Sequence, residues 1–118
     1  MVETAEFEVE VNEFARFFEG HFPGDPVFPA VAQLVELVDR QARKRLRGLT
    51  HRYPSRVVRA KFEAPIRPND RLRVQLRCEG EVTPQLRFMI EKVNGSDVVR
   101  VSSGLIEYGL VIQGDVGG

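Results

Sequence analysis

One histidine lies in a segment whose residue types suit acid–base chemistry. His21 stands in a loop that leads into a predicted helix, and turn-forming residues follow it, namely Pro23, Gly24, Pro26 and Pro29. An imidazole accepts a proton near neutral pH because its ordinary pKa is about 6.5. The free N–H groups at a helix start favour negative charge and stabilise an oxyanion that forms beside them. This segment therefore predicts a general base next to an oxyanion site.

A long amphipathic helix is predicted to hold this site, beginning near Pro29 and ending near Gly48. Proline suits the first helical position because its missing N–H would have no partner there. The apolar residues that form one helical stripe, predicted to face the core, are Val31, Leu34, Val35, Val38, Ala42, Leu46 and Leu49. Arg45 and Arg47 suit the last turn, where the helix dipole favours positive charge.

Strands are predicted on both sides of the helix. Phe7, Val9 and Val11 predict a half-buried strand, which a short aromatic helical turn follows at residues 13–19. Residues 56–66, 71–77, 86–93 and 98–108 are predicted as further strands, the last two joined across Asn94 and Gly95. One helix and an antiparallel sheet make the fold class α+β, with a single domain over residues 1–113 and a flexible Gly-rich tail over 114–118. A lone helix leaves the sheet partly uncovered, so we expect at least a dimer.

The composition is that of an ordinary folded protein. With 42% hydrophobic and 29% charged residues, the chain of 118 residues can bury one core, so disorder is not expected. A formal net charge of zero argues against binding of nucleic acid by the whole surface. Cys78 is the single cysteine, which excludes an internal disulfide or a thiolate metal cluster and favours a reducing, cytoplasmic location. We expect no metal, no cofactor, no signal peptide and no membrane span.

Charge is distributed unevenly along the chain. Residues 40–61 contain no acid, and the basic residues there are Arg40, Arg43, Lys44, Arg45, Arg47, Arg52, Arg56, Arg59 and Lys61. Two interpretations stay open, a solvated surface or a docking patch for an acidic partner. His51 lies in the same stretch and is interpreted as a surface residue.

Two segments resemble the hot-dog 3-hydroxyacyl-[acyl-carrier-protein] dehydratases of fatty acid or polyketide and polyene synthesis. Residues 21–30 read His-Phe-Pro-Gly-Asp-Pro-Val-Phe-Pro-Ala, where the family has His-Phe-x-Gly-x-Pro-Val-x-Pro-Gly. Residues 61–72 are similar to the family's Lys-Phe-x-x-Pro-Val-x-Pro-Gly-Asp-x-Leu, and Gln33-Leu34 is typical of a subgroup of dehydratase-like proteins. The resemblance covers most of the chain, and it implies a long central helix wrapped by an antiparallel sheet and assembled as a dimer.

The resemblance also implies a reaction, the dehydration of (3R)-hydroxyacyl thioesters on acyl carrier protein, or on CoA, to trans-2-enoyl thioesters. His21 would be the general base, oriented by the backbone carbonyl of Val27, and the N–H of Ala30 would polarise the thioester carbonyl. The other residues expected near the substrate are Phe22, Gly24, Phe28 and Val35, with Phe17 and Phe18 along the acyl chain. The acidic carrier protein would dock on Arg40, Arg43, Lys44 and Arg47.

The chain departs from the family at the second catalytic group, an acid that falls fourteen residues after the histidine and is Val35 here. On a regular α-helix the adjacent Glu36 points about 100° away, whereas Asp39 lies about 6 Å further along the axis and about 40° off. Either carboxylate is a candidate catalytic acid. The alternative is that each is a charge on the helix surface, with Glu36 paired to Arg40 and Asp39 paired to Arg43 four residues later.

Three functions therefore stay open. The first is an active dehydratase. The second is a catalytically weak or silent homologue that binds acyl thioesters or pairs with an active subunit in a heterodimer, because Val35 replaces the acid. The third is a hot-dog thioesterase, which needs a carboxylate placed to activate water.

Overall fold

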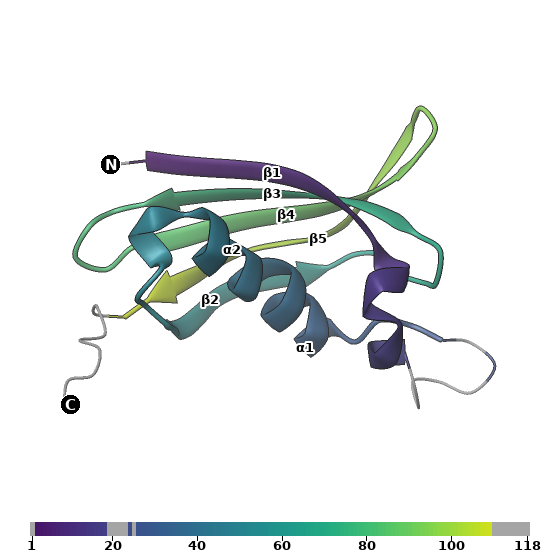
Figure 1. Ribbon diagram of the computed structural model, residues 1–118, viewed down its shortest axis with the longest axis horizontal. Coiled ribbons are helices and arrows are strands. Elements are labelled where there is room, and N and C mark those ends of the chain that lie inside the picture. The colour runs from purple at the N-terminus through teal and green to yellow at the C-terminus, as the bar shows by residue number, and fades with distance from the viewer. Residues whose placement is uncertain (1, 19–23, 25, 110–118) are drawn as a thin grey trace.

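A five-stranded antiparallel sheet packs along one helix in the computed structural model, which describes residues 2–18, 24 and 26–109 (Figure 1). The strands are β1 (Val2–Glu10), β2 (Pro54–Phe62), β3 (Arg71–Glu79), β4 (Gln85–Asn94) and β5 (Asp97–Tyr108). Their order in the sheet is β1-β3-β4-β5-β2, and every neighbouring pair is antiparallel. The predicted α+β class is confirmed. The predicted tail at 114–118 lies outside the described residues.

The central helix is continuous, but its hydrogen-bonding pattern changes from α to π and back to α along its length. It consists of α1 (Ala30–Ala32), the π-helical segment η2 (Gln33–Asp39) and α2 (Arg40–Arg45). The predicted end near Gly48 is wrong, because Leu46 already has extended backbone angles and Gly48 lies in the short 3-10 helix η3 (Arg47–Leu49). The Glu3 carboxylate on β1 accepts hydrogen bonds from the N–H groups of Arg47 (3.0 Å) and Gly48 (2.7 Å). This contact with β1 stabilises the turn that follows the helix.

The predicted apolar stripe of the helix is only partly buried. Its buried members are Val38, Ala42, Leu46 and Leu49. The prediction is wrong for Val31 and Val35, which are 71% and 43% exposed. The helix instead turns Ala32, Gln33 and Leu37 toward the interior, so its buried face is rotated from the one that the apolar spacing predicts. Among the described residues, no helix is long and apolar enough to cross a membrane.

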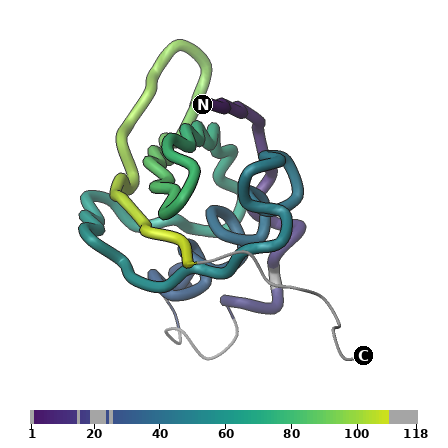
Figure 2. The backbone as a smooth tube through the Cα atoms, turned by 90° about the vertical axis from the view of Figure 1, so that its left-hand side faces the viewer, coloured from purple at the N-terminus to yellow at the C-terminus, as the bar shows by residue number. Residues whose placement is uncertain are grey.

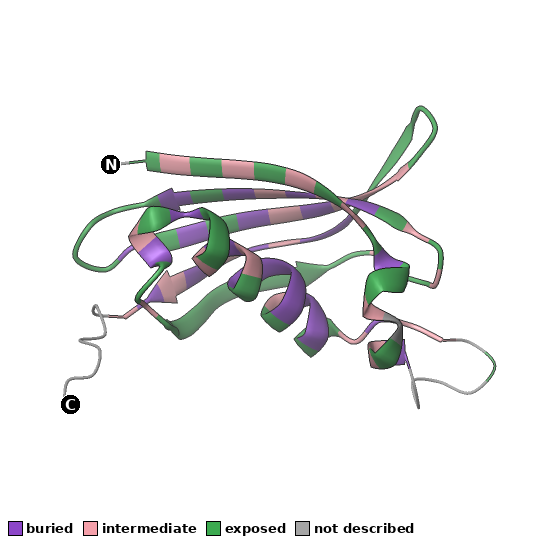
Figure 3. Ribbon diagram, viewed as in Figure 1, coloured by how far each residue is buried: buried purple, intermediate pink, exposed green. Residues whose placement is uncertain are grey.

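The core lies between the helix and one face of the sheet, as the alternating colours along the strands in Figure 3 indicate. The buried hydrophobic residues of the strands are Leu72, Val74, Leu76, Cys78, Leu86, Phe88, Ile90, Val101, Ile106 and Tyr108, and Ser102 and Gly104 of β5 are buried as well. The alternation predicted for residues 71–77 is confirmed, since Leu72, Val74 and Leu76 are buried. At the N-terminal end, η1 (Val11–Phe18) is the aromatic helical turn that the sequence predicts, formed as a 3-10 helix.

β2 is an exposed edge of the sheet. All nine of its residues are exposed, and among the described strands β5 alone pairs with it. The strand ends at Phe62 rather than at the predicted Ile66, which is fully buried but lies beyond the strand. The carbonyl of Ile66 accepts a hydrogen bond from the N–H of Phe28 at 2.8 Å. This bond joins the segment after β2 to the segment that precedes the helix.

The hairpin of β4 and β5 projects from the body of the molecule in two perpendicular views (Figures 1 and 2). Asn94 pairs with Asp97, so Gly95 and Ser96 are the central residues of the turn, one position later than predicted. Gly95 has a φ of 64°, a left-handed value that glycine adopts without the strain of a Cβ. The hairpin itself is where the Asn-Gly pair predicts it.

Candidate active site

A groove of about 270 Å³ lies where the start of the helix meets the segment after β2. Its lining residues are Val27, Phe28, Ala30, Gln33, Phe62, Glu63, Ala64 and Pro65. All of them except Gln33 come from the two sequence segments that carry the resemblance, residues 21–30 and 61–72, and the bond between Phe28 and Ile66 holds those segments together. Six lining residues are apolar, and the polar ones are Gln33 and Glu63. Apolar clefts with a few polar groups are typical of small-molecule binding sites.

An aromatic cluster supports one wall of the groove. Phe28 is 1% exposed, and its ring centre lies 6.1 Å from that of Phe14, 5.7 Å from Phe17 and 5.5 Å from Phe18. Phe17 and Phe18 therefore pack on Phe28 and do not themselves line this groove. Rings at such distances stabilise one another beyond the area they bury. The wall beside the helix start is consequently well packed.

The helix start presents backbone donors beside the groove. Pro29 is the N-cap residue, and the first bond of the helical ladder runs from the Gln33 N–H to the Pro29 carbonyl at 3.1 Å. The N–H of Ala30, which precedes that bond, has no acceptor within the helix. Ala30 is not among the described residues with positive φ, so alanine replaces the family's glycine without backbone strain. The position is thus compatible with the donor role expected of Ala30.

The π-helical segment alters the geometry expected of the two candidate carboxylates. The N–H of Arg40 donates to the carbonyl of Val35, an i→i+5 bond. Because this turn holds more residues than an α-helical turn, Glu36 is turned away from Val35 by less than a regular helix predicts. Glu36 and Asp39 are each 8% exposed, whereas Val35 is solvent-exposed. Both carboxylates are therefore more buried than ordinary helix-surface charges.

Asp39 is tied to strand β5. The Tyr108 hydroxyl donates to Oδ1 of Asp39 at 2.5 Å, and Nη2 of Arg43 lies 3.0 Å from Oδ2. The Arg43 guanidinium also stacks over the Tyr53 ring, 4.6 Å from its centre. Burial, together with the bond to Asp39, raises the pKa of Tyr108 well above its usual value. Asp39 thus forms the predicted pair with Arg43 and a further bond that joins helix to sheet.

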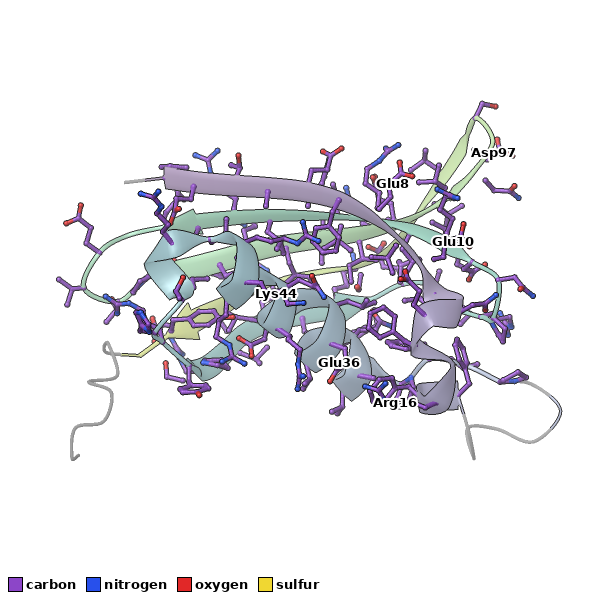
Figure 4. The ribbon with its side chains drawn as sticks, viewed as in Figure 1. Glu8, Glu10, Arg16, Glu36, Lys44 and Asp97 are labelled. Atoms are coloured by element: carbon purple, nitrogen blue, oxygen red, sulfur yellow. The ribbon has the colours of Figure 1, made fainter. Side chains whose placement is uncertain are left out.

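Glu36 has a looser environment. Its Oε1 lies 3.6 Å from Nε of Arg40, whose side chain is 59% exposed. In Figure 4 Glu36 lies on the half of the helix that is nearer to Arg16 of η1, while Lys44 lies towards the other end. The predicted pair with Arg40 is present, but within the described residues no further hydrogen bond to the Glu36 carboxylate is recorded.

The chain matches the sequence model of the ApeI-like family, described as ApeI dehydratase, over residues 2–104. It belongs to the ApeI-like dehydratase family. Dehydratases named FabZ from Yersinia enterocolitica and Yersinia pestis are 32% identical over an alignment of 89 residues that covers 70% of this chain. The match covers 53% and 51% of those relatives, so this family member spans about half their length.

Solved structures share the fold of this chain. An uncharacterized protein from Erwinia carotovora superposes with a TM-score of 0.83 at 28% identity, covering 95% of this chain and 87% of that one. The dehydratase heterocomplex ApeI:P of Xenorhabdus doucetiae superposes with a TM-score of 0.71 at 22% identity, covering 92% of this chain and 94% of that one. A thioesterase superfamily member from Thermus thermophilus superposes with a TM-score of 0.67 at 23% identity, covering 98% of this chain and 85% of that one. The last two likenesses concern the fold alone. The predicted hot-dog fold is confirmed.

The other residues predicted for the site of this member of the ApeI-like family are dispersed. His21 and Phe22 lie outside the described residues, so their roles stay predictions. Gly24 is exposed with a φ of 82°. Of the predicted docking residues, Arg40 and Arg43 are engaged with Glu36 and Asp39, while Lys44 and Arg47 are exposed.

Sequence reasoning missed two polar pairs that link the helix to β5. One joins Tyr108 to Asp39, and the other joins Ser102 to Gln33 through a hydrogen bond of 2.9 Å. One feature of the sequence points to the second pair: Ser102 occupies a position that is expected to be buried in a predicted, mostly apolar strand. It does not indicate which helix residue meets it, because the partners are 69 positions apart.

A larger hollow of about 560 Å³ lies across the outer face of the sheet. Its arginines are Arg59, Arg77, Arg87 and Arg100, and Thr4, Gln75 and Met89 also line it. None of the described residues that were predicted for the catalytic site lines this hollow. The smaller groove at the helix start is therefore the candidate active site.

The bond between Tyr108 and Asp39 predicts a measurable loss of stability at alkaline pH. Tyr108 titrates near its ordinary pKa of 10.0 in the unfolded chain but at a higher pH in the folded one. The stabilisation is thus complete below pH 10 and declines above it, because the unfolded state releases the proton first. We expect Tyr108 to account for a decline of about 1 kcal/mol in the free energy of unfolding between about pH 10 and 11.

Urea unfolding across this pH range measures the effect. Tyr108→Phe is expected to lack this part of the decline, whereas Tyr53→Phe, which changes a tyrosine that is 57% exposed, is expected to retain it. If the free energy of unfolding declined equally with pH in wild type and in Tyr108→Phe, the prediction would be contradicted.

Proposed function

We propose that this chain dehydrates (3R)-hydroxyacyl thioesters, carried on acyl carrier protein, to trans-2-enoyl thioesters. The observation that carries the proposal is the apolar groove at the helix start, where both dehydratase-like segments meet. The FabZ relatives are named 3-hydroxyacyl-[acyl-carrier-protein] dehydratases, and the description of the matching family is ApeI dehydratase. Incubation with a 3-hydroxyacyl thioester, followed by detection of the enoyl product, tests the proposal.

The reaction needs a base, an oxyanion donor and an acid. His21 removes the proton from C2, and the resulting enolate oxygen is held by the N–H of Ala30 at the helix start. The electron pair then forms the C2–C3 double bond as the C3–O bond breaks. A carboxylic acid protonates the leaving hydroxyl, which departs as water. His21 ends with one proton more and the acid with one fewer, and exchange through solvent restores both.

Glu36 is the better candidate for the acid. Both oxygens of Asp39 have close partners, since Oδ1 accepts from Tyr108 and Oδ2 lies against Arg43. Among the described residues, Glu36 has one ion pair, at 3.6 Å, with a largely exposed arginine. A carboxyl group that must give up and regain a proton works best where its oxygens are not committed to other partners.

Two matched amide substitutions test this assignment. Glu36→Gln is expected to lower kcat by about 10²-fold or more and to change the free energy of unfolding by less than about 1 kcal/mol. Asp39→Asn is expected to lower the free energy of unfolding by about 1–3 kcal/mol, because it weakens buried bonds to Tyr108 and Arg43, and to leave kcat within about threefold. Steady-state kinetics and urea unfolding separate the two effects. The opposite pattern, with kcat lost in Asp39→Asn alone, would assign the acid to Asp39.

A catalytically silent subunit is a second candidate, favoured by one observation. The family's acid position holds Val35, and Val31 beside it on the helix is likewise exposed. A helix with two exposed valines next to a predicted catalytic site is suited to contact another subunit, and the Xenorhabdus relative is described as a heterocomplex. Val35→Glu discriminates between the candidates. If enoyl product forms only with Val35→Glu, the native chain is silent; turnover by the native chain alone excludes this candidate.

A dimer completes the proposal. β2 is an edge strand with exposed Val57, Val58 and Phe62, and such edges are usually covered by another chain. We expect a homodimer or larger assembly that covers β2. Light scattering of the purified chain measures this, and a monomer would contradict it.

The carrier protein is proposed to dock on Arg40, Arg43, Lys44 and Arg47. Lys44→Glu should then raise KM for carrier-bound substrate but not for a pantetheine thioester.

A further inference from the structure

Gln33 and Ser102 form a hydrogen-bonded pair in the layer between the helix and β5. The Ser102 hydroxyl donates to Oε1 of Gln33 at 2.9 Å, and the two residues are 0% and 4% exposed. Ser102 lies opposite Phe62 of β2, which lines the groove. Buried polar groups are costly unless they are hydrogen-bonded, so this pair holds Gln33 in one orientation.

The orientation directs the amide nitrogen away from β5. A carboxamide carries its acceptor oxygen and its NH₂ donors on separate branches of the planar Cδ, pointing in different directions. Because Ser102 holds the oxygen, the NH₂ group faces the other way, and Gln33 is a lining residue of the groove. Within the part of the chain that the structure describes, no hydrogen bond from this nitrogen to another residue is recorded. The groove thus contains a side-chain donor whose position is set by the sheet.

Gln33 also lies close to the backbone donor at the helix start. It follows Ala30 by three positions, a spacing that makes two residues neighbours on one helix face. Side chains on a helix lean toward its N-terminus, so the Gln33 side chain lies over the turn that Ala30 begins. Both residues line the groove. The Ala30 N–H and the Gln33 amide are therefore two donors available to one bound group.

We propose that the Gln33 amide donates a second hydrogen bond to the thioester carbonyl oxygen of the acyl substrate, beside the N–H of Ala30. The proposal rests on the dehydratase function above and assigns a further residue to its oxyanion site. Negative charge grows on this oxygen as His21 removes the C2 proton, so the bond strengthens in the transition state. Ser102 does not touch the substrate and acts as a positioning residue.

The first test is kinetic. Gln33→Leu is expected to lower kcat by about 100-fold with little change in KM, the result of losing one oxyanion donor. Gln41→Leu is the matched control, because Gln41 lies on the same helix, outside the groove, and accepts a bond from Arg45. Equal kcat values for the two variants, in samples that unfold at similar urea concentrations, would overturn the proposal.

A pH profile separates donation by Gln33 from a purely structural role. In Gln33→Glu a carboxylate replaces the amide, so it opposes the oxyanion when ionised but donates a bond when protonated. The kcat of Gln33→Glu relative to wild type is therefore expected to rise as the pH falls through the carboxyl pKa. Ser102→Ala, which frees the amide to rotate, is expected to lower kcat about tenfold and to show no such rise. If the ratio of kcat in Gln33→Glu to kcat in wild type did not depend on pH, this would contradict hydrogen-bond donation by residue 33.

The last test does not require turnover and so distinguishes this inference from the proposed function. Crotonyl-pantetheine carrying a ¹³C carbonyl is the probe, and its carbonyl stretch is recorded by infrared difference spectroscopy on the bound protein. Hydrogen-bond donors shift this band to lower frequency. We expect a smaller shift in Gln33→Leu than in wild type or Gln41→Leu. If no variant dehydrates but this difference is present, the inference stands and the proposed function fails; identical bands overturn the inference.

Discussion

Replacing His21 by alanine is expected to lower kcat for 3-hydroxyacyl thioester dehydration by about 10²–10⁴-fold, the usual contribution of a general base. The residual rate would come from the donors at the helix start and from binding in the groove. His21 is the histidine of the dehydratase-like segment, and that segment continues into the groove through Val27, Phe28 and Ala30. No other histidine competes for the role except His51, which is exposed in the turn before β2.

His51→Ala is therefore the matched control and is expected to leave kcat unchanged. Added imidazole offers a second measurement, because a small base that enters the groove should restore part of the activity of His21→Ala. The measurement is the appearance of the enoyl thioester under saturating substrate. Comparable kcat values for the two alanine variants would remove His21 from the mechanism.

Gly104→Ala is expected to destabilise the fold by about 3 kcal/mol or more, at the upper end of overpacking effects. Gly104 lies on β5 between Ala60 of β2 and Phe88 of β4. A Cβ there would clash with the backbone carbonyl of Arg59 and would lie 2.6 and 2.8 Å from two ring carbons of Phe88. The carbonyl belongs to the neighbouring strand and cannot move without disturbing the ladder, and Phe88 is buried in the core.

Gly109→Ala provides the control for this substitution. A Cβ at Gly109 would meet the Ser55 side chain and the Tyr53 carbonyl at 3.8 Å, an ordinary van der Waals distance. Its free energy of unfolding should stay within about 0.5 kcal/mol of wild type. Urea unfolding of the three proteins measures the difference. A similar midpoint for Gly104→Ala and Gly109→Ala would mean that β2 relaxes away from β5 at little cost.

Most of the secondary structure could be predicted from local patterns. The alternation of Leu72, Val74 and Leu76 identifies β3, and the Asn94-Gly95 pair identifies the hairpin of β4 and β5. These predictions succeed because the period of a strand and the φ required in a tight turn are properties of neighbouring residues. The likeness of residues 21–30 and 61–72 to dehydratases likewise led to the correct family, since both motifs are contiguous in sequence.

The sequence by itself thus determined the fold class and a helix start next to Pro29, and it predicts the candidate chemistry around His21. Only the tertiary structure decided where the helix ends, which of its apolar residues are buried and which carboxylate is bonded to a residue of the sheet. Glu3 contacts the turn after the helix across 44 and 45 positions, and β5 meets Asp39 and Gln33 across 69. Such contacts depend on which strands lie beside the helix, and periodicity within a segment carries no information about that arrangement.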